Sequence, residues 1–182
     1  MKYLKYLLLI LVFSCKGEVN VESHKEVTKE EVTKLEEEVN TDNVELEIHD
    51  FNGLEKYLNF KDDKTYVVNF WATWCAPCVK ELPHFEALYK NYKANDVEVL
   101  LVSLDFPNQY DKKLKPFIVK HDLQSKVLVL NDVDMNTWIP KVNENWDGAI
   151  PVTIIYNKDK REFYDTTFTY EELETELKQF IN

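Results

Sequence analysis

Short apolar runs recur along the C-terminal part of this 182-residue chain, and each has the length of a β-strand. They are rich in valine, isoleucine, leucine and aromatic residues, which suit a buried, pleated backbone. The last run is the weakest of the set. In chain order the runs cover residues 66–71, 97–104, 127–130, 152–156 and 162–164. We predict a strand over each of them.

Helical patterns separate these runs. Residues 79–92 follow the first predicted strand, and residues 110–121 lie between the second and third, where a proline bends or breaks the helix. Residues 170–181 close the chain. There Thr169 and Glu172 have the spacing of a capping box, and apolar residues recur on one face.

The order of these elements predicts a layered α/β domain. Strands alternate with helices, and residues 157–160 have the composition of a hairpin turn between the last two strands. The stretch 45–182 has the size of one domain with one core. It holds all the tryptophans and every phenylalanine except Phe13, so it is well supplied with side chains to bury.

The N-terminus has the pattern of an export signal. Residues 1–14 carry two lysines, then an apolar run over 6–13 and a small residue, Ser14. The run is too short to span a membrane comfortably. Its end resembles a bacterial lipobox, in which the signal is cut before the cysteine, here Cys15, and that cysteine carries the lipid. An ordinary signal peptide or an uncleaved anchor is the alternative. Either way we expect an exported protein of the cell envelope or periplasm.

Residues 15–44 are expected to form an acidic tether. Acidic residues outnumber lysines there, and the sequence of 26–29 recurs at 31–34. Since no aromatic residue occurs between Cys15 and Phe51, little can be buried, and we predict a disordered or weakly helical segment. The formal net charge of −11, with no basic stripe, argues against nucleic acid as a partner.

The candidate chemistry lies between the first strand and the helix after it, in Trp74-Cys75-Ala76-Pro77-Cys78. A C-x-x-C pair beside a β-α-β pattern is a redox signature. Unpaired N–H groups at the helix N-terminus favour a thiolate on the first cysteine. The chain has only one further cysteine, Cys15, so no structural disulfide framework is possible within it.

Two segments together resemble the exported TlpA/ResA-like thiol-disulfide oxidoreductases, which have a thioredoxin-like fold. Residues 68–83 match the active-site segment of that family, and residues 148–153 match its cis-proline loop, in the same order along the chain. The resemblance covers about 45–182. It implies a central mixed β-sheet flanked by helices.

The positions of the two cysteines predict their roles. Cys75, at the start of the helix, is expected to be the nucleophile, and Cys78, one turn further in, the resolving thiol. Glu81 lies one turn beyond Cys78 and matches the acidic residue that ResA-like proteins keep beside their cysteines, where it exchanges protons. The alternative is a solvated first-turn glutamate. Asn69 stands where thioredoxins proper carry a buried aspartate, so a proton relay from that position is in doubt.

Further residues are expected to contact the substrate. The resemblance makes Pro151 the cis-proline, which presents the Ile150 backbone to an extended substrate peptide. Trp74, Ala76 and Pro77 are expected to lie beside the same peptide. Two more tryptophans, Trp138 and Trp146, either wall this groove or pack in the core.

The leading interpretation is an enzyme that reduces protein disulfides, for which cytochrome c maturation is one substrate class that the resemblance suggests. An upstream membrane thiol would supply its electrons. No cofactor is expected. A disulfide oxidase or isomerase remains open, as does a copper or zinc carrier that uses the same thiolates. The histidines show no paired ligand spacing for a closed zinc site. A peroxidase is disfavoured because a separate peroxidatic cysteine is lacking.

Overall fold

The computed structural model describes residues 39–181 of the chain. The predicted signal sequence, Cys15 and the tether up to residue 38 lie outside the described residues. The described residues form one compact unit. No helix within 39–181 is both long enough and apolar enough to cross a membrane.

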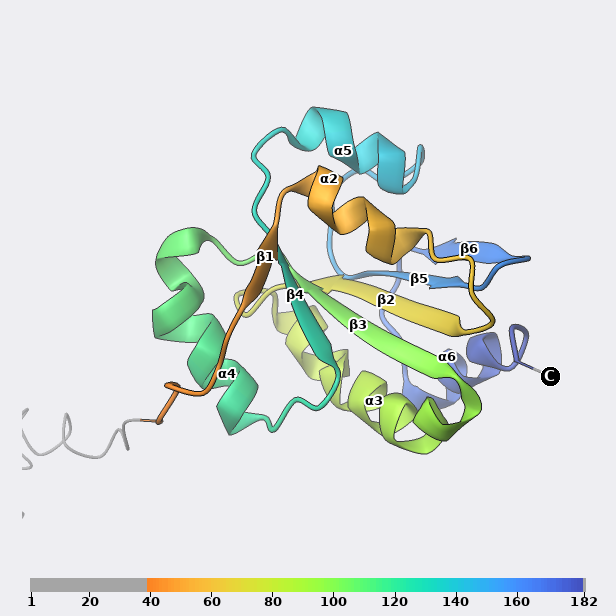
Figure 1. Cartoon of the computed structure of the whole chain (residues 1–182), viewed down its shortest axis with the longest axis horizontal. Helices are drawn as coiled ribbons and strands as arrows, with labels where there is room; N and C mark the ends of the chain where they lie inside the picture. Colours follow the sequence, from red (N-terminus) through yellow and green to blue (C-terminus); the bar gives the residue numbers. More distant parts are fainter. Residues whose placement is uncertain (1–38, 182) are drawn as a thin grey trace, which may run out of the picture. The chain divides into compact units, whose positions relative to one another are not determined.

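A six-stranded mixed sheet forms the centre of the molecule, with the strand order β1-β4-β3-β2-β5-β6 (Figure 1). The first four strands in that order run parallel, and β5 and β6 each run antiparallel to the preceding neighbour. The strands are β1 (Glu47–His49), β2 (Thr65–Trp71), β3 (Val97–Ser103), β4 (Lys126–Leu130), β5 (Val152–Tyr156) and β6 (Arg161–Tyr164). All five predicted strands are confirmed, and so is the mixed sheet.

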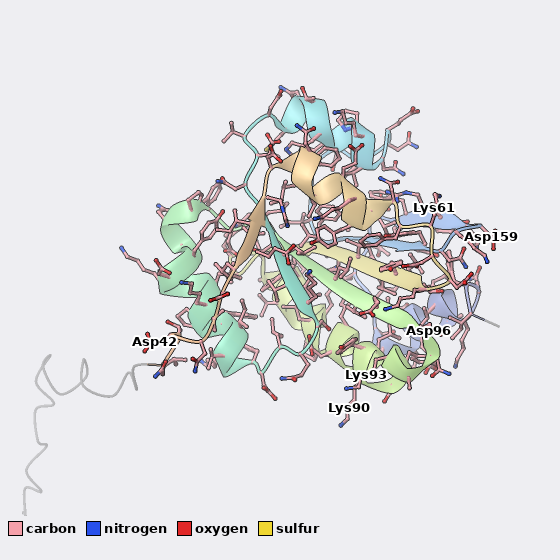
Figure 2. The ribbon with its side chains drawn as sticks, in the orientation of Figure 1. Asp42, Lys61, Lys90, Lys93, Asp96 and Asp159 are labelled. Atoms are coloured by element: carbon pink, nitrogen blue, oxygen red, sulfur yellow. A yellow bond between two sulfur atoms is a disulfide. The ribbon has the colours of Figure 1, made fainter. Side chains whose placement is uncertain are left out.

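Helices cover both faces of the sheet (Figure 1). On one face lie α3 (Ala76–Tyr92) and α6 (Tyr170–Leu177), and on the other lie α2 (Phe51–Leu54) and α5 (Met135–Val142). The side chains of β2 alternate between two cores because successive strand residues point to opposite faces. Trp71 belongs to the core under α3 and α6, whereas Phe70 belongs to the core under α2 and α5. Charged side chains such as Lys61, Lys90 and Asp159 project outward at the periphery (Figure 2).

The predicted helices are present, with corrected limits. Helix α3 begins at Ala76 rather than at residue 79, because Cys75 caps it. The predicted helix 110–121 is a π-helical turn, η4 (Tyr110–Leu114), followed by α4 (Lys115–Lys120). Its proline, Pro116, stands directly after the π-helical turn, at the second residue of α4. Helix α6 has the predicted capping box but ends at Leu177, four residues early, and gives way to a turn.

Strand β1 and the helices α2 and α5 were not predicted. Strand β1 has only three residues, two of them charged or polar, so no apolar run marks it. Helix α5 contains Pro140, and only Trp138 and Val142 are buried in it. Short 3-10 turns join other elements: η1 (Glu55–Leu58), η2 (Lys93–Asn95) and η3 (Pro107–Gln109).

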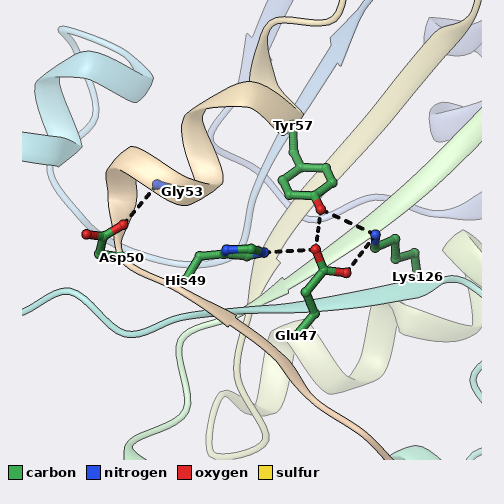
Figure 3. Close-up of polar contacts among 6 residues, drawn as sticks. All are labelled: Glu47, His49, Asp50, Gly53, Tyr57 and Lys126. Atoms are coloured by element: carbon green, nitrogen blue, oxygen red, sulfur yellow. Dashed lines mark hydrogen bonds and ion pairs between the residues drawn. The ribbon is translucent and has the colours of Figure 1, made fainter.

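A polar cluster fastens the edge strand β1 to the rest of the sheet (Figure 3). The Glu47 carboxylate forms an ion pair with Lys126 of β4 at 2.7 Å and accepts a hydrogen bond from the Tyr57 hydroxyl. His49 lies 2.9 Å from the same carboxylate. The hydrogen bond from Lys126 is the main reason that the pKa of Glu47 falls to about 2, with Tyr57 adding to it. The cluster therefore holds β1 in register despite its length.

Candidate functional site: a disulfide at a helix N-terminus

Cys75 occupies the N-cap position of α3, at the end of the loop that leaves β2. Its N–H donates to the carbonyl of Ala72, and its Sγ accepts the N–H of Cys78 at 3.3 Å. Pro77 stands in the first turn, where its missing N–H leaves no intrahelical bond unmade. The loop and the helix start together fix the sulfur of Cys75 at the positive end of the helix.

Cys75 and Cys78 form a disulfide with a Cα–Cα distance of 5.3 Å. Cys75 is 6% exposed and Cys78 is fully buried, so only the first sulfur has a path to a partner. Ala76 and Pro77, which lie between them, are exposed. Within 39–181, no group of three histidine, cysteine, aspartate or glutamate side chains is arranged to hold a metal ion.

The Ile150–Pro151 loop faces the disulfide, and its peptide bond is cis. The carbonyl oxygen of Ile150 lies 3.7 Å from Sγ of Cys75, although 75 residues separate the two in sequence. The loop is held from behind by Trp146, whose Nε1 donates to the carbonyl of Ala149 at 2.7 Å. The structure thus brings Cys75, Pro77, Ile150 and Pro151 to one place.

Trp138 and Trp146, which precede the Ile150–Pro151 loop in the sequence, are buried in the core under α2 and α5. Trp138 and Trp146 pack edge to face, with ring centroids 5.6 Å apart. Of the two roles predicted for these tryptophans, packing in the core is therefore the correct one, rather than forming a wall of the substrate groove. Trp146 still bears on the site indirectly, through its hydrogen bond to the loop.

Glu81 is buried behind the cysteines and is 2% exposed, so the interpretation as a solvated glutamate is wrong. Its two carboxylate oxygens accept from Nδ2 of Asn69 at 3.0 Å and from the N–H of Phe168 at 2.9 Å. Burial raises the pKa of Glu81 to about 7, and these two hydrogen bonds oppose the rise. Glu81 and His84 both line a hollow of about 260 Å³.

Asn69 lies within the sheet, directly beside this carboxyl. Besides Glu81, its Nδ2 donates to Oγ1 of Thr153 on the neighbouring strand at 3.2 Å. The amide therefore orients the carboxyl as a donor and has no proton of its own to exchange near neutral pH. Of these two side chains, only Glu81 is ionisable.

Sequence reasoning missed Asp105, which holds the loop before the cysteines. This buried carboxylate follows β3 and accepts from the N–H and hydroxyl of Thr73, at 3.1 and 2.5 Å. It also accepts from the hydroxyl of Ser103 at 2.9 Å. One signal could have found it. Asp105 directly follows a predicted strand, and polar residues at the carboxyl ends of neighbouring parallel strands meet at one edge of the sheet.

Trp74 lies at the surface beside the disulfide. Its side chain is 56% exposed and stacks on Phe106, which is 61% exposed, with ring centroids 6.2 Å apart. The sequence placed Trp74 at the site, but it gave no reason to select Phe106, which stands 32 residues further on. Cys15 lies outside the described residues.

A mixed sheet, a C-x-x-C disulfide at a helix N-terminus and a cis-proline loop against its first sulfur define a thioredoxin-fold dithiol protein. Comparison with known proteins agrees. The family model described as "AhpC/TSA family" matches residues 39–161. The chain belongs to the AhpC/TSA family.

Curated relatives of this chain carry the name thiol-disulfide oxidoreductase ResA. One from Bacillus cereus is 30% identical over 112 residues, which cover 62% of this chain and 60% of the relative. One from Bacillus thuringiensis subsp. konkukian is 33% identical over 112 residues, covering 62% and 54%. The chain thus spans a little over half the length of these relatives.

Solved structures share the fold. A DsbF homologue from Corynebacterium diphtheriae superposes with a TM-score of 0.54 at 19% sequence identity. The match covers 69% of this chain and 75% of the homologue. At that identity the likeness supports the fold alone.

Proposed function

We propose that this protein is a thiol-disulfide oxidoreductase whose reactive pair is Cys75 and Cys78. The observation that carries the proposal is the asymmetry of the pair. The Cys75 sulfur lies at a helix N-terminus against the Ile150 carbonyl, and the Cys78 sulfur is fully buried. The names of the curated relatives support the same activity.

The reaction we propose is a two-step thiol-disulfide exchange. In the reduced protein the Cys75 thiolate attacks one sulfur of a substrate disulfide, and the other substrate sulfur leaves with the bonding electrons. The Cys78 thiolate then attacks the Cys75 sulfur, which closes the Cys75–Cys78 disulfide and releases the second substrate thiol. Two electrons pass from the protein dithiol to the substrate. The N–H of Cys78 and the helix N-terminus stabilise the attacking thiolate.

Glu81 is the proposed proton acceptor for the second step. Cys78 must lose its proton before it attacks, and it is fully buried, one helical turn before Glu81. A carboxyl with a pKa of about 7 accepts and returns a proton at neutral pH with little cost. The hollow lined by Glu81 and His84 is the route by which we propose that this proton reaches solvent.

The substrate is proposed to be a protein segment in extended conformation. Ile150 and Pro151 precede β5, and a substrate strand that pairs with this backbone passes over Cys75. Trp74, Ala76 and Pro77 are exposed around the sulfur and are expected to contact the same strand. Protein disulfides therefore fit the site better than small disulfides, which would leave this surface empty.

We further propose that the domain works outside the cytoplasm, tethered through a lipid on Cys15, in the reducing direction. The export pattern of residues 1–14 and the Ser14-Cys15 pair support this. A membrane thiol protein would return electrons to the pair. Cytochrome c maturation, which needs reduced haem-binding cysteines, is the process in which such an activity fits.

The test is a trap for the mixed disulfide. A Cys78→Ser variant lacks the resolving thiol, so it is expected to accumulate disulfide-linked adducts with its substrates in the cell envelope. These adducts are separated on non-reducing gels and identified by mass spectrometry. The matched Cys75→Ser variant is expected to trap none. If Cys75→Ser forms the adducts instead, the assignment of the nucleophile fails.

A further inference from the structure

Two large aromatic side chains are exposed beside the reactive sulfur. Trp74 directly precedes Cys75, and Phe106 stacks on it with an interplanar angle of 16°. Each leaves more than half of its surface in contact with solvent. Single exposed apolar residues need no explanation, but a stacked pair next to a reactive centre marks a binding surface.

These rings border a hollow of about 550 Å³, which we call the aromatic hollow. Thr73 and Trp74 come from the loop before α3, and the remaining residues come from the segment after β3 and from η4 and α4. Its lining is Thr73, Trp74, Phe106, Gln109, Lys113 and Phe117. Its volume lies within the range of ligand-binding clefts, so it has room for a large side chain of a bound peptide.

Lys113 gives the rim of the aromatic hollow a positive charge. It is exposed, and within 39–181 it forms no ion pair. Lys115, in the same segment, is paired with Asp111 at 2.7 Å, and Lys113 is the basic residue that lines the hollow. An acidic residue on a bound peptide therefore meets an available cation at this rim.

The hollow beside the cis-proline loop has the opposite character. A hollow of about 350 Å³ runs along Pro77, Ile150 and Pro151, and its charged lining residues are Asp147 and Asp165. It contains no aromatic and no basic side chain. Of these two hollows, only the aromatic hollow offers a bound peptide aromatic rings and a basic side chain.

We propose that the aromatic hollow selects the substrate segment by taking a large apolar side chain close to the reactive cysteine, with an acidic residue beside it at Lys113. This inference rests on the proposed function and adds a preference for the residues that flank the cysteine of the substrate. Phe106 and Lys113 are the residues that set the preference. They touch the peptide away from the sulfurs, so they act on substrate affinity and leave the exchange chemistry unchanged.

The experiment uses short peptides with one cysteine, linked by a disulfide to thionitrobenzoate. In the reduced protein the Cys75 thiolate attacks the peptide sulfur, and coloured thionitrobenzoate leaves with the electron pair. Cys78 then releases the peptide thiol. The peptides carry Phe-Asp, Ala-Asp or Phe-Lys, on either side of the cysteine. The mixed disulfide of cysteamine and thionitrobenzoate, which has no side chain to bind, reports the chemistry alone.

The reduced protein is expected to react about tenfold faster with the Phe-Asp peptide than with the Ala-Asp peptide, in one placement only. Phe106→Ala is expected to remove that ratio through KM. Lys113→Glu is expected to reverse the preference between Phe-Asp and Phe-Lys by about threefold, an effect that salt weakens. Both variants are expected to keep the parent rate with the cysteamine disulfide.

The matched control is Lys90→Glu, which makes the same charge change at an exposed position near the far end of α3 (Figure 2). It is expected to leave all peptide preferences unchanged. Equal rates for all peptides, or an undiminished Phe preference in Phe106→Ala, would overturn the inference while the oxidoreductase stands. Failure to react even with the cysteamine disulfide would instead overturn the proposed function.

Discussion

Replacing Glu81 by glutamine is expected to change how the stability of the protein depends on pH. The substitution keeps the size of the side chain and removes the proton that it exchanges. Glutamine has one acceptor oxygen, whereas the carboxylate uses both of its oxygens for Asn69 and Phe168. We therefore expect two opposing effects, a constant cost from one lost hydrogen bond and a gain that appears only where Glu81 would be ionised.

The size of the second effect follows from the pKa. Burial raises the pKa of Glu81 from 4.5 to about 7 in the folded protein. Between these values the folded state keeps a proton that the unfolded state has lost, so the free energy of unfolding falls as the pH rises. The stabilisation is complete below pH 4.5 and is gone above about pH 7. One pKa unit corresponds to about 1.4 kcal/mol, so ionisation of Glu81 costs about 3 kcal/mol.

The lost hydrogen bond costs about 1 to 3 kcal/mol at every pH. At about pH 4.5 only this cost remains, and Glu81→Gln is less stable than the parent by that amount. At about pH 8 the parent also carries the cost of the ionised carboxyl, so Glu81→Gln is expected to equal the parent or to exceed its stability by up to about 2 kcal/mol. The difference between them is thus expected to change by about 3 kcal/mol across the range.

The measurement is urea unfolding followed by tryptophan fluorescence, with the Cys75–Cys78 disulfide closed and no reductant present. Taking the difference between two proteins cancels every other group that titrates. Glu144→Gln, at an exposed glutamate, is the matched control, and its stability is expected to run parallel to that of the parent. If the curve of Glu81→Gln also runs parallel to the parent, the buried carboxyl does not titrate in this range and the argument is refuted.

Two further substitutions test the structure around the site and at the sheet edge. Asp105→Ala leaves the donors of Thr73 and Ser103 without their acceptor, and it is expected to cost about 3 kcal/mol in urea unfolding and to slow exchange. A cost no larger than the roughly 1 kcal/mol expected for Ser103→Ala would contradict this account. At the edge, the lowered pKa of Glu47 means that its pairing with Lys126 stabilises above pH 4.5 and is lost as the pH falls toward 2. Because the pair is partly exposed, Glu47→Gln is expected to remove about 1 kcal/mol or less near neutral pH and nothing below about pH 2, and a loss that persists there would refute it.

The sequence was sufficient for the parts of the fold that depend on local pattern. Apolar runs located β2, β3, β4 and β5 because most residues of these strands are buried, whereas β6, which has no buried residue, gave the weakest run. The capping box located the start of α6. Strand β1 was not predicted because its register depends on contacts of Glu47 with Tyr57 and Lys126, which lie 10 and 79 residues away in the sequence. Helix α5 was not predicted because only Trp138 and Val142 are buried along it, which is too few to give a clear apolar pattern.

The candidate site divides in the same way. Cys75, Cys78 and Glu81 follow one another at helical spacing, so their proximity was visible in the sequence. Asp105 and Phe106 reach the site only because β3 lies beside β2 in a parallel pair, which brings the two strand ends together. The partners of the Glu81 carboxyl, Asn69 and Phe168, come from a strand and a loop that no local pattern connects to it.

The cost of burying Glu81 also bears on its role. A carboxyl that only filled space between Asn69 and Phe168 would lower the stability of the protein by about 3 kcal/mol above pH 7, and an amide would avoid that cost. A proton acceptor for Cys78 needs the titrating group that carries this cost. Glu81→Gln therefore separates the two roles in one protein. If Glu81 accepts the proton, the variant keeps its stability at about pH 8 but resolves mixed disulfides more slowly, and its rate loses the pH dependence near 7. If Glu81 is structural only, the stability of the variant shows the same pH dependence relative to the parent, but the rate of resolving mixed disulfides keeps the pH profile of the parent.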